Sequence, residues 1–195
     1  MGKRILVIEG HPDRETGRFN HALAGAYADG ARAGGHEVRR LVVAELDFPL
    51  LRSKAEWEHG PVPPGLVPAQ QAIAWAEHLV FVFPLWLGGM PALLKGFLEQ
   101  VARPGFALGE PAGLAHLPKK LLAGRSARLV VTMGMPALAY RWIYRAHSLK
   151  ALERNILGFV GIAPVDETLI GMVEGNAKDR ERWLVRIARL GASAA

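Results

Sequence analysis

The sequence has no cysteine among its 195 residues. This absence excludes a disulfide scaffold, a thiolate zinc site, an iron–sulfur cluster and a cysteine nucleophile. Serine is scarce as well, since only four are present and none lies in the G-x-S-x-G context of a hydrolase nucleophile. Redox chemistry, if the chain performs any, must therefore belong to a bound cofactor.

Long apolar runs are also missing. The longest stretch without a polar or charged side chain runs from Leu79 to Leu94, and two prolines and two glycines interrupt it. It is shorter than the ~20 apolar residues that a membrane-spanning helix needs. The apolar run Ile5–Ile8 near the start is too brief for the core of a signal peptide. We therefore expect a cytoplasmic protein that is not embedded in a membrane.

The sequence lacks an H-E-x-x-H motif, and no two of its seven histidines are four residues apart. No helical zinc site is predicted, and we expect no bound metal. The charge is positive, +6, from 24 Lys and Arg against 18 Asp and Glu. Basic side chains are scattered among acidic ones, as in residues 178–182, whereas nucleic-acid binders concentrate them on one face. We expect no nucleic-acid partner, and a mild attraction for phosphorylated cofactors.

What is present is an alternation of short apolar runs with helical patterns, over a length that suits one domain, residues 1–195. The predicted strands are residues 5–8, 37–43, 79–83, 128–132 and 165–172. The predicted helices cover 19–31, a segment after Pro68, a segment from Pro91 to about 103, 138–157 and 183–190. This order is typical of an α/β fold, a doubly wound five-stranded parallel sheet with helices on both faces.

Residues 44–67 lie outside this alternation and contain four prolines. A long irregular segment inside a compact domain is often functional. We expect it to be an irregular loop that covers a substrate. Its role is inferred from its position alone.

Ligands of doubly wound sheets bind at the carboxyl ends of the strands, where the strand order reverses. The functional loops should therefore follow the first, third and fourth strands. We define them as the first loop, residues 10–20, the second loop, residues 84–91, and the third loop, residues 132–140.

The first loop lacks both G-x-G-x-x-G and the G-x-x-x-x-G-K-[ST] phosphate motif. It is a turn that opens directly into a helix, whose free N–H groups and positive dipole end attract a phosphate. Gly17 would let the backbone approach the anion, His11 and Arg18 would add positive charge, and Thr16 and Asn20 offer neutral partners. An ordinary capped turn is the alternative interpretation.

The second loop, P-L-W-L-G-G-M-P, is apolar and rich in glycine. An indole, aliphatic side chains and free peptide N–H groups suit a flat aromatic ligand. The alternative is that Trp86 and Leu87 simply pack in the core. The third loop again places small, flexible residues at a strand end, and Tyr140, Tyr144 and His147 follow it as polar groups.

These loops resemble the NAD(P)H dehydrogenase (quinone) family of flavodoxin-like flavoproteins. That family includes mammalian quinone reductases, ancillary oxidoreductases of bacterial potassium-efflux systems, and drug-activity modulators. The resemblance rests on residues 5–12 with Phe19 and Asn20, on residues 83–96, and on residues 103–107. It extends over nearly the whole chain.

The resemblance implies FMN, or alternatively FAD, with NAD(P)H as electron donor, a quinone-like acceptor and a homodimer. The flavin phosphate would be held by His11, Gly17, Arg18, Phe19 and Asn20. The ring would be lined by Pro84, Leu85, Trp86, Leu87 and Gly88, and its pyrimidine side or ribityl chain by Thr132, Met133, Gly134 and Met135. Tyr140 and His147 would be the catalytic groups above the ring.

Two features depart from the family pattern. Many members have Thr-Thr-Gly-Gly in the third loop, where this chain has Thr-Met-Gly-Met. The chain also lacks the C-terminal extension of the mammalian members, which favours FMN over FAD. The predicted function is two-electron transfer from NAD(P)H through a flavin to a quinone. The alternatives are a regulatory subunit of a potassium-efflux transporter and a one-electron shuttle, the latter disfavoured by the basic surface.

Overall fold

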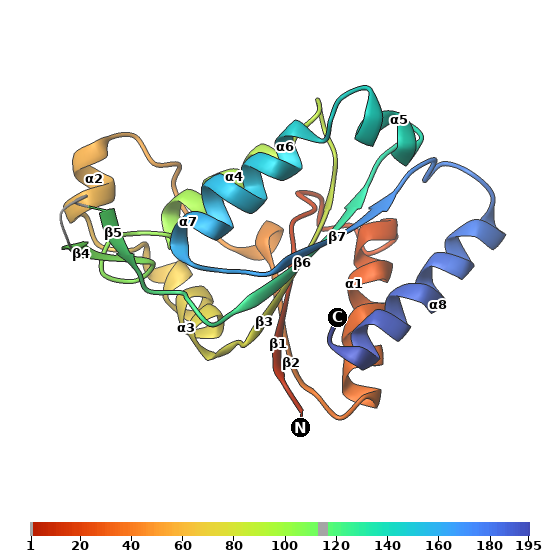
Figure 1. The fold of residues 1–195 in the computed structure, drawn as a ribbon, viewed down its shortest axis with the longest axis horizontal. Helices are drawn as coiled ribbons and strands as arrows, with labels where there is room; N and C mark the ends of the chain where they lie inside the picture. Colours follow the sequence, from red (N-terminus) through yellow and green to blue (C-terminus); the bar gives the residue numbers. More distant parts are fainter. Residues whose placement is uncertain (1, 113–116) are drawn as a thin grey trace.

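A computed structural model of the chain describes residues 2–112 and 117–195. Its main sheet has five parallel strands in the order β2-β1-β3-β6-β7 (Figure 1). Their bounds are β1 Arg4–Glu9, β2 Glu37–Val42, β3 His78–Pro84, β6 Ser126–Thr132 and β7 Val165–Ile170. All five predicted strands and the doubly wound arrangement are confirmed.

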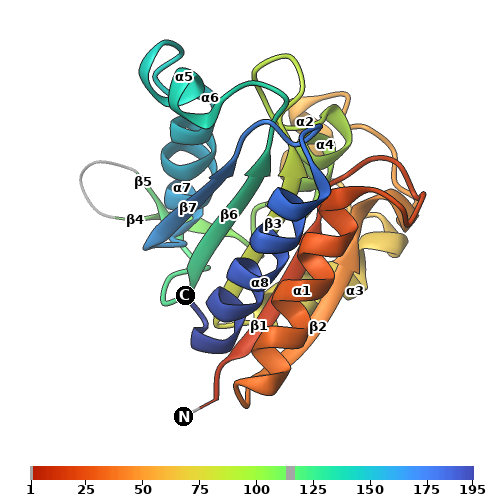
Figure 2. The same ribbon diagram turned by 90° about the vertical axis from the view of Figure 1, so that its right-hand side faces the viewer.

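Helices cover both faces of this sheet (Figures 1 and 2). One face carries α1 (Phe19–Ala33) and α8 (Ala177–Ser193). The other carries α3 (Val67–Trp75), α4 (Ala92–Val101) and the run α5 (Ala137–Trp142), α6 (His147–Lys150), the π-helix η3 (Ala151–Leu157) and α7 (Gly158–Val160). Strand side chains alternate between the two cores, so Val7 packs toward α1 and Leu6 toward the opposite layer.

The strand order reverses at β1. Its neighbours in the sheet are β2, reached through α1, and β3, reached through α3 on the opposite face. The chain leaves β1 through α1 on one face and leaves β3 through α4 on the other, so the loops at the carboxyl ends of β1 and β3 diverge and leave room between them. The sheet thus positions the first and second loops at the expected edge.

The segment 44–67 is not irregular throughout, which corrects the expectation. It contains the 3₁₀ helices η1 (Val43–Glu45) and η2 (Pro64–Leu66), and between them α2 (Lys54–His59). Helix α2 begins at Ser53, whose hydroxyl oxygen accepts the Glu56 N–H at 3.1 Å. The sequence S-x-x-E is the usual signal for such a start, and it is present in the chain.

Buried side chains of α4 and its end hold this segment in place. Gln100 donates to the Pro49 carbonyl at 2.7 Å. The Arg103 guanidinium donates to the carbonyls of Glu56, at 2.6 Å, and Gly60, at 3.0 Å. Both side chains are buried. The segment is therefore fixed to α4 at several points, and its expected role of covering a substrate stays a prediction.

Two further features differ from the prediction. The helix expected over 138–157 is broken between α5 and α6, where Arg145 and Ala146 have left-handed backbone angles, φ 52° and 49°. The break lets Tyr140 and Leu149 both enter the core, since an uninterrupted helix would fix their relative directions. An unpredicted hairpin, β4 (Leu108–Ala112) with β5 (Leu117–Lys120), follows α4. No helix in the described residues is long and apolar enough to span a membrane.

Candidate functional site

The three loops meet at the carboxyl edge of the sheet. The Leu85 N–H donates to the Thr132 carbonyl at 2.7 Å, which joins the second and third loops. The Thr132 hydroxyl donates to the Asn20 side-chain oxygen at 2.9 Å, which joins the third loop to the first. The rings of His11 and Trp86 lie 5.7 Å apart, edge to face, between the first and second loops. The predicted convergence is therefore present.

His11 begins the first loop as a buried residue. Its Nδ1 accepts the N–H of Asp13 at 3.1 Å. Burial lowers the pKa of His11, and the neighbouring His21 lowers it further. The ring is therefore neutral at neutral pH, and because Nδ1 is an acceptor, Nε2 carries the proton. His11 offers the site one neutral N–H donor.

Arg18 is less available than the sequence suggested. Its guanidinium contacts the carboxylates of Asp13, at 2.7 Å, and Glu15, at 2.6 Å. Two negative charges therefore offset the one positive charge that was expected to face the anion. Arg18 precedes α1 without making a side-chain cap, and Phe19 packs in the core between α1 and α8. Gly17 stands in open space, since a side chain added there would meet no atom within 4 Å.

Asn20 carries the most informative feature of the first loop. The residue is 6% exposed, and its amide nitrogen is buried without any hydrogen-bond partner among the residues described. A buried donor of this kind costs about 1–3 kcal/mol when left unpaired. An acceptor oxygen of a ligand at the start of α1 would satisfy it. A phosphate or a hydroxyl fits this requirement.

The second loop is a tight turn. Trp86 and Gly89 exchange both backbone hydrogen bonds at 2.9 Å, and the central residues Leu87 and Gly88 have φ of 47° and 79°. Within the described residues, the N–H groups of Leu87 and Gly88 donate to no protein acceptor. Trp86 is 49% exposed and Leu87 109%, so the alternative that they pack in the core is wrong. The preceding residues differ, because Pro84 is buried and Leu85 partly so.

The third loop is tied to the end of β7. The Met133 N–H donates to the Ile170 carbonyl at 2.9 Å, and the Met135 carbonyl accepts the Met172 N–H at 3.2 Å. Thr132 and Met133 are buried. Gly134 is exposed, and a side chain added there would meet no atom within 4 Å. The open part of this loop is therefore the backbone around Gly134.

The two expected catalytic groups lie in different surroundings. Tyr140 is buried in the core, and its hydroxyl lies 2.6 Å from the Ser148 hydroxyl. His147 is exposed at the start of α6. No hydrogen bond or ring contact in the described part of the chain links either side chain to the first or second loop. Their catalytic roles stay predictions.

Sequence reasoning missed a charged cluster directly beside the first loop. Glu9, the last residue of β1, is buried and contacts both His21 of α1 and Arg40 of β2. A signal for this cluster was present in the sequence, because Glu9 directly follows the apolar run Ile5–Ile8. A charge at the end of a buried run needs partners, and these come from two elements that follow it in the chain.

A comparison with known protein families identifies the family to which this architecture belongs. A family model described as "Flavodoxin-like fold" matches residues 3–190. The chain belongs to this flavodoxin-like family.

Several named proteins are similar to this flavodoxin-like chain. An "Uncharacterized NAD(P)H oxidoreductase" of Haemophilus influenzae is 28% identical over 174 residues, covering 85% of this chain and 82% of that protein. The "Glutathione-regulated potassium-efflux system ancillary protein KefG" of Escherichia coli is 44% identical over 78 residues, 39% of this chain and 38% of that protein. The solved NAD(P)H:quinone oxidoreductase from Methanothermobacter marburgensis has a TM-score of 0.81 at 24% identity, with both chains covered completely.

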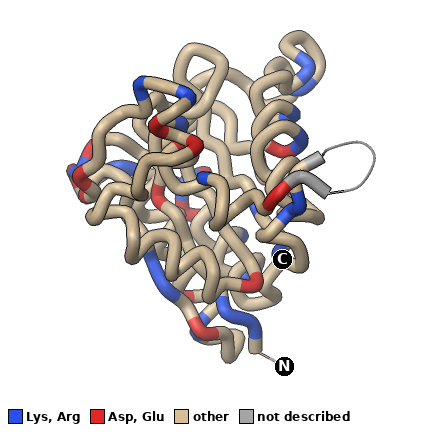
Figure 3. The backbone as a smooth tube through the Cα atoms, turned by 90° about the vertical axis from the view of Figure 1, so that its left-hand side faces the viewer, with Lys and Arg blue, Asp and Glu red and all other residues tan. Residues whose placement is uncertain are grey.

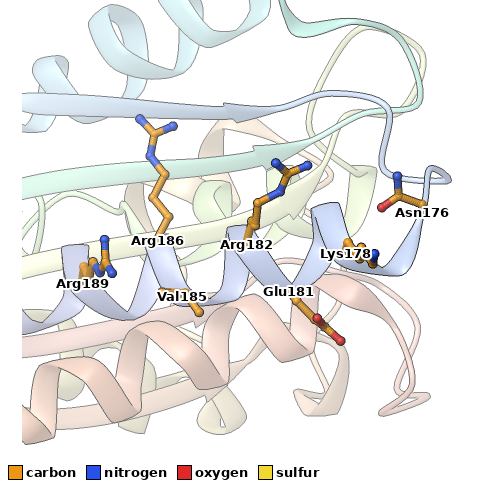
Figure 4. Close-up of a pocket in the computed structure, with 7 residues that line it drawn as sticks. All are labelled: Asn176, Lys178, Glu181, Arg182, Val185, Arg186 and Arg189. Carbon is orange, nitrogen blue, oxygen red and sulfur yellow. The ribbon is translucent and has the colours of Figure 1, made fainter.

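One large hollow of this flavodoxin-like chain lies away from the three loops, along α8. Basic and acidic segments are interspersed over the backbone as a whole (Figure 3). Along α8, however, Lys178, Arg182, Arg186 and Arg189 line one hollow of about 900 Å³. Figure 4 shows Arg182 and Arg186 pointing the same way and Glu181 pointing away from them. Positive charge is therefore more concentrated on α8 than the sequence alone indicated.

Proposed function

We propose that the chain, working as one domain, is a flavin-dependent NAD(P)H oxidoreductase that passes two electrons from NAD(P)H through FMN to a quinone-like acceptor. The observation that carries this proposal is the unpartnered, buried Asn20 amide at the start of α1, where three open loops converge. The names of the similar proteins support the reaction class.

The first loop would hold the phosphate of the flavin. The donors are the Asn20 amide, the His11 Nε2–H and the backbone at Gly17 and Phe19, at the positive end of α1. Arg18 would contribute little net charge because Asp13 and Glu15 offset it. One helix terminus with these donors suits the single phosphate of FMN, and FAD, with its pyrophosphate, is the alternative.

The second and third loops would hold the ring. Trp86 and Leu87 offer exposed apolar surface, and the N–H groups of Leu87 and Gly88 are available for ring heteroatoms. The open backbone at Gly134 would face the pyrimidine side or the ribityl chain. The bound flavin supplies the redox chemistry itself, and these residues orient it and exclude water.

The catalytic roles of Tyr140 and His147 form part of this proposal. His147 is exposed and is assigned to proton donation toward the acceptor. Tyr140 would stabilise negative charge only if its hydroxyl exchanged the Ser148 contact for one to the ligand. A cytoplasmic homodimer completes the proposal. It would cover the exposed apolar side chains on α5 and directly after it, which are Leu138, Trp142, Ile143 and Tyr144.

The deciding experiment uses purified protein loaded with FMN under anaerobic conditions. Excess NADH or NADPH should bleach the flavin absorption band near ~450 nm, and a quinone should restore it. Absence of bleaching with both nucleotides overturns the proposal. The absorbance and mass of any flavin released by denaturation distinguish FMN from FAD.

A second candidate function is an ancillary subunit of a potassium-efflux transporter. It is favoured by the 44% identity to KefG over 78 residues. Slow turnover of the loaded protein, together with its specific co-purification with an efflux channel, would support this candidate over the first.

A further inference from the structure

A buried ionic cluster lies beneath the first loop and has no part in the proposed function so far. Glu9 is 1% exposed at the end of β1. One oxygen of its carboxylate accepts from Arg40 of β2, at 2.9 Å from Nε and 2.5 Å from Nη2. The other oxygen lies 2.7 Å from Nδ1 of His21, in the first turn of α1. The cluster therefore joins β1, β2 and α1 at one point.

His21 extends this cluster into the first loop. Its Nε2 lies 2.9 Å from the backbone carbonyl oxygen of Asp13. A carboxylate and a carbonyl can only accept hydrogen bonds, so both ring nitrogens must donate for both contacts to be favourable. The form of His21 that satisfies this geometry is the doubly protonated, positively charged ring. A neutral ring would leave one nitrogen lone pair facing an oxygen.

The charge on the His21 ring is important because the other charges in and beneath the first loop balance one another. Within the loop, Arg14 and Arg18 are matched in number by Asp13 and Glu15. In the cluster beneath it, the single carboxylate of Glu9 contacts two partners, Arg40 and His21. With both ring nitrogens donating, His21 gives this group of residues one net positive charge. Neighbouring His11, whose ring centre is 5.7 Å away, is neutral and adds none.

We propose that His21 is a positioning residue for anion binding by the first loop. Held between Glu9 and the Asp13 carbonyl, it fixes the shape of the loop and makes the site prefer a phosphorylated flavin to an unphosphorylated one. The inference rests on the proposed function, since it names what selects the ligand of that site. The groups facing His21 are Glu9 from β1 and His11 and Asp13 from the loop, with Arg40 of β2 reached through Glu9.

The test compares FMN with riboflavin, which has the same ring and no phosphate. Apo-protein is titrated with each flavin, and binding is followed by flavin fluorescence. His21→Gln should weaken FMN binding about tenfold and leave riboflavin binding within about twofold, because one buried charge near the phosphate is lost. His59→Gln, a matched change on the exposed face of α2, should alter neither. Equal losses for both flavins, or no loss for FMN, would overturn the proposal.

The comparison of the two flavins provides a readout that a merely structural role would not move. A substitution that only loosens the loop should weaken FMN and riboflavin alike, because the two ligands share the ring and the ribityl chain. A loss confined to FMN identifies the phosphate as the group that His21 serves.

Two further measurements test the proposal if the His21 variant does not fold or if the wild type binds no flavin. Should His21→Gln fail to fold, Arg40→Gln removes the same net charge from a side chain that is 40% exposed, and the same selective loss of FMN is expected. Should the wild type bind neither flavin, the proposed function fails, and inorganic phosphate becomes the probe. It should raise the unfolding temperature of the wild type more than that of Arg40→Gln, and equal shifts would overturn the inference.

Discussion

His78 makes the stability of the protein depend on pH in a way that can be worked from its surroundings. The residue begins β3 and is 1% exposed. Its Nδ1 lies 2.8 Å from the Ser126 hydroxyl, and its Nε2 is buried with no partner among the described residues. The ring stacks on Tyr27, with ring centres 6.4 Å apart. Burial, with smaller contributions from the charges of Lys3 and Arg128, lowers the pKa of His78 to about 4.

The sign of the effect follows from which state binds the proton. Between the unfolded pKa of about 6.5 and the folded pKa of about 4, the unfolded chain is protonated at His78 and the native state is not. Acid therefore favours unfolding, and the stability present above about pH 6.5 is lost as the pH falls. The loss amounts to about 2 kcal/mol at pH 5 and about 3 kcal/mol at pH 4.

The substitution His78→Phe removes the titrating group and keeps an aromatic ring against Tyr27. Unfolding free energies from urea titrations, followed by circular dichroism, would be compared at about pH 8 and pH 5. Relative to wild type, the variant should gain about 2 kcal/mol on going to the lower pH. His59→Phe, at an exposed position, is the matched control and should show no such gain. If wild type and His78→Phe differ by the same amount at both pH values, the ring is not held neutral and the reasoning is wrong.

Three other substitutions test the candidate site and its supports. Asn20→Ala should weaken FMN binding roughly tenfold in a fluorescence titration, because the amide that has no protein partner would no longer be available to the ligand. The free energy of unfolding of the apo-protein should fall by only about 1 kcal/mol, since the Thr132 hydroxyl alone loses a partner. Unchanged FMN affinity would exclude this amide as a ligand. Leu87→Gly should stabilise the apo-protein by up to about 1 kcal/mol in urea unfolding, since a left-handed φ of 47° strains leucine. A loss of stability would show that the Leu87 side chain makes stabilising contacts with the rest of the protein. Arg103→Met should cost about 3 kcal/mol and speed proteolysis within residues 50–60, because two backbone carbonyls lose a buried donor. Wild-type protease resistance would show that the segment is held by other contacts.

The strands and their positions along the chain were predictable because the determining features are local. Runs such as Ile5–Ile8 and Leu79–Phe83 are apolar without alternation, which only a strand buried on both faces requires. The rule that such sheets bind ligands at their carboxyl ends then brought the three loops together correctly. The break after α5 was not predictable in this way, because Arg145 and Ala146 carry no local signal for a left-handed backbone. It is imposed by packing of the flanking residues in the core.

By itself, the sequence determined that this chain forms a doubly wound sheet and cannot use thiols for redox chemistry, because periodicity and composition are properties of the chain alone. It also located the three loops. Only the tertiary structure decided which charged side chains are offset by neighbours and which are available to act on a ligand at the site. Arg18, the cation nearest in sequence, is offset by Asp13 and Glu15, whereas His21 lies between the Glu9 carboxylate and the Asp13 backbone carbonyl. The physical reason is that a side chain's protonation and net field depend on the partners that folding places within a few ångströms, and those come from β1, β2 and α1 together.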